Sequence, residues 1–135
     1  MPVEVVGMEE NSVNSNSILL DVKKISGINP LNEDDFDNEL IVSVNTVLMT
    51  LNQLGFCKPG FYITGESERW SDMLLDDEAD IHAIKTWVAL RTRLLFDPPT
   101  SSVLMQAIKE QIAEYEWRIY INKNFVGEID GLYRR

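Results

Sequence analysis

Hydrophobic residues recur at three- and four-residue spacing in four stretches of this chain. The stretches are 17–27, 33–55, 77–96 and 101–121, each with polar residues at most of the intervening positions. This spacing places the apolar side chains on one face of a helix, so each stretch predicts an amphipathic helix with one buried side. We therefore expect an all-α protein, a small bundle of about four helices with an extended aromatic loop and extended terminal arms.

Local signals mark the ends of these helices. Ser17 precedes the first apolar run and Gly27 follows it, as expected of a helix cap and a helix stop, and Lys23 and Lys24 lie near the C-terminal end, where the helix dipole favours cations. Asp97 precedes two prolines that cannot continue a helix. The remaining signals are the acidic start of the second helix (Glu33, Asp34, Asp35, Asp37) and a cap of the fourth at Thr100, Ser101 or Ser102.

The expected core positions share the helical spacing. They are Leu19, Leu20, Val22 and Ile25 in the first helix, and Phe36, Leu40, Val44, Val47, Leu48, Leu51 and Leu54 in the second. The third helix contributes Ile81, Ile84, Trp87, Val88, Leu90, Leu94 and Leu95, and the fourth contributes Leu104, Ala107, Ile108, Ile112, Tyr115 and Ile119.

The segment between the second and third helices is irregular and aromatic. Turn signals at 58–60 and 64–65 flank Phe61, Tyr62 and Ile63, which predicts a small hairpin or an extended loop. Residues 70–75 are predicted to form one helical turn with Asp72 near its start. The aromatic residues have two interpretations: they form a contact surface, or they fold back to cover the bundle.

The domain organisation follows from these elements. Residues 17–121 are predicted to form one helical domain. Residues 1–16, rich in Asn and Ser, are predicted to be a flexible leader, and residues 122–135, where the helical spacing fades, are predicted to form a C-terminal arm.

Composition excludes several classes of function. The 135 residues carry a formal net charge of -10, which disfavours a protein that grips nucleic acid through its phosphates. Cysteine and histidine occur once each, so neither a disulfide within the chain nor a Cys/His zinc site closed by one subunit can form. No apolar stretch reaches the roughly 18–20 residues of a membrane span, and the first residues lack a signal peptide. We expect a soluble intracellular protein without membrane contact.

Catalytic motifs are weak. His82 is the only histidine, and the chain has no G-x-S-x-G motif that would supply a nucleophilic serine beside it. Cys57 lies just after a predicted helix end, where a structural thiol is the default interpretation. The acidic group Asp76, Asp77, Glu78 and Asp80 misses the spacing of a calcium loop, and no glycine-rich phosphate loop exists. We therefore expect no enzyme activity, no catalytic residue, no metal and no cofactor.

Three segments resemble the head-to-tail connector (adaptor) proteins of tailed bacteriophages. They are SILLDVKKISGI near the start, ERWSDML in the loop, and AIKTWVALRTRLLFDPPTSSVLMQAIKEQIAEYEWRI toward the end. The resemblance covers roughly residues 17–119, and its most distinctive parts are Leu95–Pro99, Glu116–Arg118 and Trp70–Asp72. Residues 1–7 and the tail after Asn122 match no motif of the family.

The resemblance implies a ring of about a dozen copies under the portal protein, in the virion neck, reached from the host cytoplasm during assembly. A further neck or tail completion protein would lie below, and genomic DNA would pass through the lumen without specific binding. The expected portal-binding residues are in the arm: Phe125, Val126, Ile129, Leu132, Tyr133, Arg134 and Arg135. The expected subunit or tail-side interface comprises Phe61, Tyr62, Ile63, Trp70, Asp72, Pro98, Pro99 and Trp117.

Two other functions fit the charge and the helices. One is an acidic DNA mimic that occupies the groove of a nucleic-acid-binding protein. The other is a helical regulatory module that binds a partner helix through Tyr115 and Trp117. Light scattering separates these functions, because a mimic is a monomer or dimer, whereas a connector forms a large ring when its portal is present.

Overall fold

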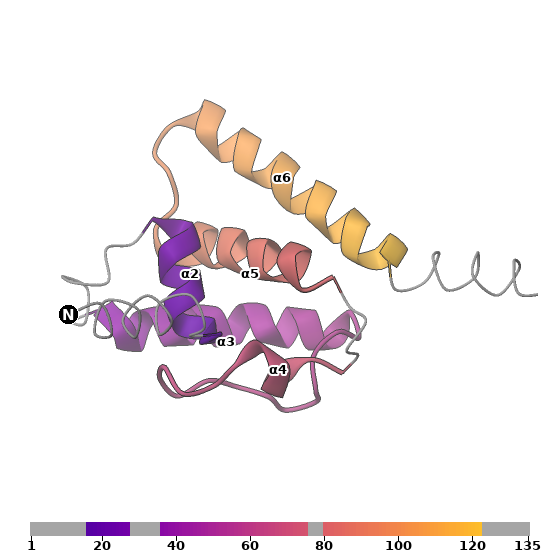
Figure 1. Cartoon of the computed structure of the whole chain (residues 1–135). Coiled ribbons are helices and arrows are strands. Elements are labelled where there is room, and N and C mark those ends of the chain that lie inside the picture. The colour runs from indigo at the N-terminus through magenta and orange to yellow at the C-terminus, as the bar shows by residue number, and fades with distance from the viewer. Residues whose placement is uncertain (1–15, 28–35, 76–79, 123–135) are drawn as a thin grey trace, which may run out of the picture.

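Helix α5 (Ile81–Phe96) is the central element, because α2 (Ile18–Ser26), α3 (Asp37–Gln53) and α6 (Ser102–Tyr120) all pack against it. The computed structural model, shown in Figure 1, describes residues 16–27, 36–75 and 80–122. A single-turn helix, α4 (Trp70–Met73), lies on the far side of α3 from α6 in this view. The described residues form helices and two isolated β-bridges, so the prediction of an all-α bundle is confirmed.

The ends of α2 follow the sequence signals. The Ser17 hydroxyl accepts a hydrogen bond from the Leu20 N–H at 3.3 Å, which satisfies one of the free donors at the helix start. Gly27 ends the helix in the left-handed conformation (φ 80°), and its N–H donates to the carbonyls of Lys23 and Lys24. A side chain at this position would be strained, and glycine therefore serves as the stop.

Lys23 departs from the sequence interpretation. It is 1% exposed, and its Nζ lies 2.6 Å from Oδ1 of Asp37 in the first turn of α3. A lysine is buried in this way only when an opposite charge compensates it. The pair therefore ties α2 to the start of α3, whereas Lys24 remains exposed as a dipole partner should.

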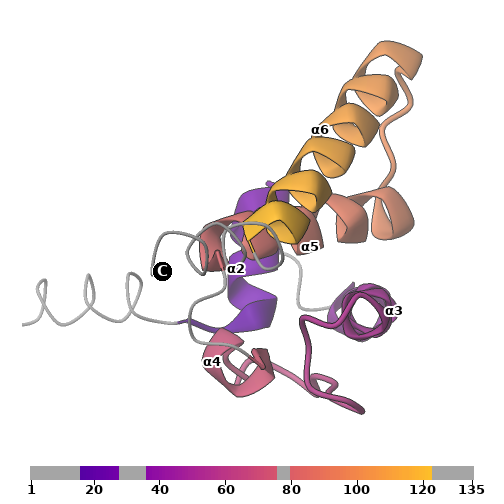
Figure 2. The same cartoon turned by 90° about the vertical axis from the view of Figure 1, so that its right-hand side faces the viewer.

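The corner between α5 and α6 also follows the sequence. Helix α5 ends at Phe96, the residues Asp97, Pro98 and Pro99 are non-helical, and the Ser101 side chain caps α6 by accepting from the Leu104 N–H. The C-terminal part of α6 lies alongside α5, and the N-terminal part of α6 diverges from it (Figure 2).

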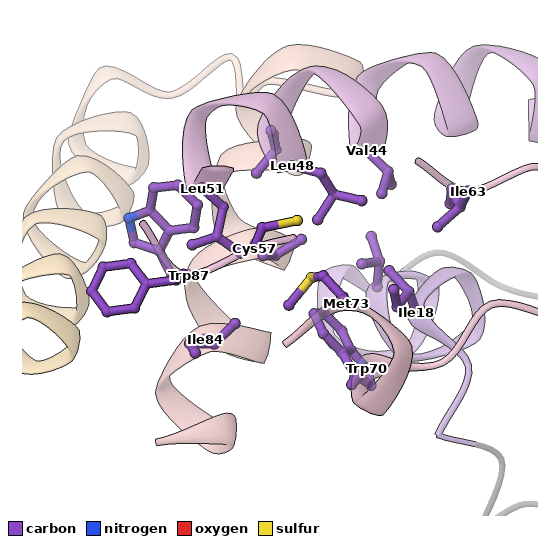
Figure 3. Close-up of a cluster of buried hydrophobic side chains, with 14 of the residues drawn as sticks. Ile18, Val44, Leu48, Leu51, Cys57, Ile63, Trp70, Met73, Ile84 and Trp87 are labelled. Carbon is purple, nitrogen blue, oxygen red and sulfur yellow. The ribbon is translucent and has the colours of Figure 1, made fainter. Parts of the chain in front are cut away.

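The core draws on each described helix: Figure 3 labels members from α2 to α5, and α6 adds Ile108, Ile112 and Ile119. Most of the expected core positions are buried, and the exceptions lie near helix ends: Ile25, Phe36, Leu54, Leu95, Leu104 and Ala107 are exposed. Periodicity indicates which face of a helix is apolar, but it does not indicate how far a neighbouring helix covers that face. Apolar residues near the helix ends can therefore remain exposed. Helix α6 illustrates this, because its N-terminal turns lean away from the body while Ile108, Ile112 and Ile119 are buried.

Candidate functional site

The side chain of Asn45 connects the aromatic loop to α3. The amide of Asn45 accepts a hydrogen bond from the Ile63 N–H at 2.8 Å and donates one to the Ile63 carbonyl at 3.0 Å. The residues around Ile63 form no hairpin, so of the two predicted forms the extended loop is the observed one. Because Asn45 satisfies both backbone groups of one residue, the loop has a fixed position relative to α3.

A second set of hydrogen bonds forms within the loop. The Thr64 hydroxyl donates to one carboxylate oxygen of Glu68 at 2.7 Å, and the Gly65 N–H donates to the other at 3.3 Å. Partial burial disfavours the charged carboxylate, but these hydrogen bonds outweigh it, and the pKa of Glu68 is lowered from its ordinary value. The ionised carboxylate thus acts as the acceptor that shapes residues 64–68.

Trp70 and Ile63 belong to the core and not to an exposed surface. They are 2% and 1% exposed, and Figure 3 shows both within the cluster of buried side chains that includes Met73. The Trp70 indole N–H donates to Oδ2 of Asp21 at 2.8 Å, and Lys85 lies 3.4 Å from the same oxygen. Of the two interpretations of the aromatic residues, the one in which they fold back on the bundle applies to Trp70, and Asp21 gives its one polar atom a partner inside the fold.

The other residues of the predicted interface remain accessible to different degrees. Tyr62 is 63% exposed, so the clipped loop presents this ring to solvent, while Phe61 is half-buried against the core. Asp72 is exposed, and its carboxylate caps α4 by accepting from the Arg69 N–H at 3.0 Å. Pro98 is exposed and Pro99 half-buried at the corner.

Trp117 lies on the outer part of α6 and is 63% exposed. It borders a hollow of about 640 Å³ together with Leu54, Phe56 and Tyr120, between the C-terminal ends of α3 and α6. The structure therefore brings Trp117 next to the C-terminal end of α3. The hollow itself was not predicted, because it depends on the angle between two helices.

The outward side of α3 is a surface that sequence reasoning missed. Val42 is 66% exposed and Met49 is 60% exposed, on the side of α3 opposite the buried Val44 and Leu48. The whole run from Leu40 to Cys57 contains no charged residue, although a quarter of the chain is charged. A solvated helix face normally carries charges, and charge depletion is typical of the centre of a protein interface. The absence of charged residues from Leu40 to Cys57 is the feature of the sequence that could have indicated this surface.

Candidate catalytic residues are not assembled into a site within the described part of the chain. Cys57 is 1% exposed, and burial raises the pKa of its thiol to about 11, so it is a structural thiol as expected. His82 is exposed in the first turn of α5, and Asp80 caps that helix by accepting from the Ala83 N–H. Among the described residues there is no group of three or more His, Cys, Asp or Glu side chains that could hold a metal ion, and no helix long and apolar enough to cross a membrane.

Some predictions fall on residues outside the described ranges. These are the leader up to residue 15, the acidic helix start at Glu33, Asp34 and Asp35, most of the acidic group at 76–79, and the portal-binding residues of the arm: Phe125, Val126, Ile129, Leu132, Tyr133, Arg134 and Arg135.

Comparison with known proteins identifies a family for the chain. A family model described as Phage connector protein matches residues 18–125, which include the five helices of the described residues and the loop between α3 and α4. No curated protein and no solved structure matches the chain. Because the matched region covers most of the chain, the protein belongs to the phage connector family and has the structural role of a connector in the virion.

Proposed function

We propose that this connector forms a closed ring of about a dozen copies below the portal and continues the DNA channel toward the tail. Copies in a ring meet through two different surfaces of the same subunit, so each subunit must expose two patches on different sides. The uncharged outward face of α3 is proposed as one of these two patches.

The charge-free face of α3 is the observation that carries the proposal. In a subunit with a net charge of -10, copies repel each other unless they meet where no acidic group lies. Val42, Thr46, Met49 and Gln53 are exposed on α3 and are all uncharged. This face is therefore where one acidic copy approaches another at the lowest electrostatic cost.

The net charge also suits the channel. Acidic subunits around a lumen repel the phosphates of the genome, so DNA passes without being held. The protein would occupy the virion neck between the portal and a further neck or tail completion protein, after assembly in the host cytoplasm.

The C-terminal arm is the proposed portal contact. Arg134 and Arg135 end a segment with five apolar residues, and paired arginines in an otherwise acidic chain suit carboxylate or carbonyl groups on a portal surface. Phe125, Val126, Ile129, Leu132 and Tyr133 would supply the apolar part of that contact.

Portal capture tests this proposal. Deleting residues 122–135 should abolish co-purification with the portal, while the circular dichroism of the helical domain changes little. Reversing Arg134 and Arg135 to glutamate should weaken capture, whereas the matched control Lys24→Glu with Lys58→Glu, which reverses two exposed cations elsewhere, should leave it intact. Undiminished capture after the deletion would remove the arm from the portal contact.

A further inference from the structure

Three hollows line one flank of α3 along its whole length. The C-terminal hollow, beside Trp117, contains Gln53 of α3, the middle hollow of about 350 Å³ contains Thr46 and Thr50, and the N-terminal hollow of about 500 Å³ contains Glu39 and Ser43. These α3 positions are three or four residues apart, so they lie on one side of the helix. The opposite wall is formed by α6 and then by the end of α5, and Leu95 borders both the middle and the N-terminal hollow. The three hollows thus follow one another along α3, and we refer to them together as the groove.

The charges along this groove change sign from one hollow to the next. Glu116 borders the C-terminal hollow, Arg91 and Lys109 border the middle hollow, and Glu39 and Asp97 border the N-terminal hollow. The order is thus negative, positive, negative. Each hollow is also lined by apolar side chains, with Leu54 in the first, Leu94 in the second and Phe96 in the third.

The sequence beyond the described residues has the complementary order. Lys123 is followed by Glu128 and Asp130, and these by Arg134 and Arg135, which gives positive, negative, positive. Apolar residues alternate with these charges in three groups: Phe125 with Val126, Ile129, and Leu132 with Tyr133. The arm therefore matches the groove in both sign and apolar content when it runs from the C-terminal hollow to the N-terminal one.

We propose that in the free subunit the arm, residues 123–135, folds back and occupies this groove of its own chain. Glu128 and Asp130 would meet Arg91 and Lys109, and the two terminal arginines would meet Glu39 and Asp97. The role of this contact rests on the proposed function, because the same arm is the proposed portal contact. Portal binding would then withdraw the arm from the groove and expose the flank of α3 to the next copy.

The length of the arm permits this path. Helix α3 has 17 residues and is about 25 Å long at 1.5 Å per residue. Thirteen extended residues reach about 43 Å, which leaves several residues for the turn at the end of α6. The arm begins just after Asn122, and Tyr120, two residues earlier, borders the C-terminal hollow, so the segment starts at the rim of the groove.

Disulfide trapping in the full chain, without portal, tests the contact. Ser43→Cys combined with Leu132→Cys should form an intrachain disulfide at least about tenfold faster than the control pair Ser71→Cys with Leu132→Cys, since Ser71 is exposed on α4, away from the groove. Peptide mass mapping identifies the linked residues. The native Cys57 does not compete while it is buried.

Charge reversal shows whether the complementary signs are responsible. Glu128→Lys with Asp130→Lys changes only the arm and should slow trapping several-fold, as should Arg91→Glu with Lys109→Glu. Combining all four changes should restore the rate. Urea midpoints confirm that the helical domain remains folded.

Equal trapping rates for the groove pair and the control pair would overturn the proposal. Disulfide-linked dimers in place of intrachain bonds would overturn it as well, because the arm would then occupy a neighbour's groove. Neither result depends on portal capture, so the groove contact and the portal contact can fail separately.

Discussion

Two tryptophans have opposite environments. Trp70 is buried against Met73 with its indole N–H bonded to Asp21, whereas Trp117 is 63% exposed on α6. Their sequence surroundings gave no such distinction, because the position of a loop residue depends on tertiary packing. Trp70 therefore stabilises the subunit, and Trp117 is available to partners.

Truncating each tryptophan separates these roles. Trp70→Ala should lower the free energy of unfolding by about 3–5 kcal/mol, because it leaves a cavity and removes the partner of Asp21. Trp117→Ala should change it by less than about 0.5 kcal/mol and reduce assembly on the portal instead. Urea unfolding and ring formation measured on both variants decide the matter. A Trp70→Ala variant of normal stability would contradict its place in the core.

Cys57 makes stability depend on alkaline pH. Its pKa is raised to about 11 by burial, so between about pH 9 and 11 the folded state keeps a proton that the unfolded state has lost. The free energy of unfolding should therefore fall with rising pH in this window, by an amount on the order of 2 kcal/mol from this thiol. Cys57→Ala should show a shallower fall, measured as the change in urea midpoint from pH 8 to 10.5. Parallel curves for the two proteins would contradict a buried thiol.

At the scale of elements, Asn45 connects the loop between α3 and α4 to α3. Asn45→Ala should release both backbone groups of Ile63 and cost about 1–3 kcal/mol. Asn45→Asp retains an acceptor for the N–H but places a carboxylate oxygen against the Ile63 carbonyl, so it should also destabilise the loop. Hydrogen exchange at Ile63 reports the loosening. A loop that stays protected in Asn45→Ala would show that burial of Ile63 alone is sufficient.

Helix boundaries were predictable because the rules that set them are local. Ser17, Gly27 and the proline pair act within a few residues of themselves, and the structure places all of them at helix ends. Tertiary features were not predictable in this way. The burial of Lys23 depends on Asp37, and the hollow beside Trp117 depends on the crossing of α3 and α6. Of the predicted interface, the sequence could indicate aromatic residues but not which of them the core takes up.

At the scale of the whole molecule, the charge is distributed unevenly along the chain. Acidic residues predominate overall, yet no charge occurs from Leu40 to Cys57, and α3 exposes part of this run. Such a distribution lets like-charged copies associate through one surface while the others remain solvated. Within the described residues, this face of α3 is the surface that a ring of copies would be expected to use.

Replacing exposed apolar residues on that face of α3 with glutamate tests whether the face forms the contact between copies. Val42→Glu with Met49→Glu should leave the urea midpoint within about 0.5 kcal/mol of the parent, because both side chains are largely exposed, and should prevent ring formation on the portal. The control Ser71→Glu with Gln111→Glu, which adds the same two negative charges at exposed positions outside α3, should assemble normally. Normal assembly of the α3 variant would place the contact elsewhere.

The most direct measurement of the central claim is the mass of the protein with and without its portal, by light scattering followed by electron microscopy of the complex. We expect a monomer alone and, with portal present, a ring of about a dozen copies seated below it. A protein that stays a monomer or dimer in the presence of portal, or that instead binds a nucleic-acid-binding protein as an acidic DNA mimic would, contradicts the account.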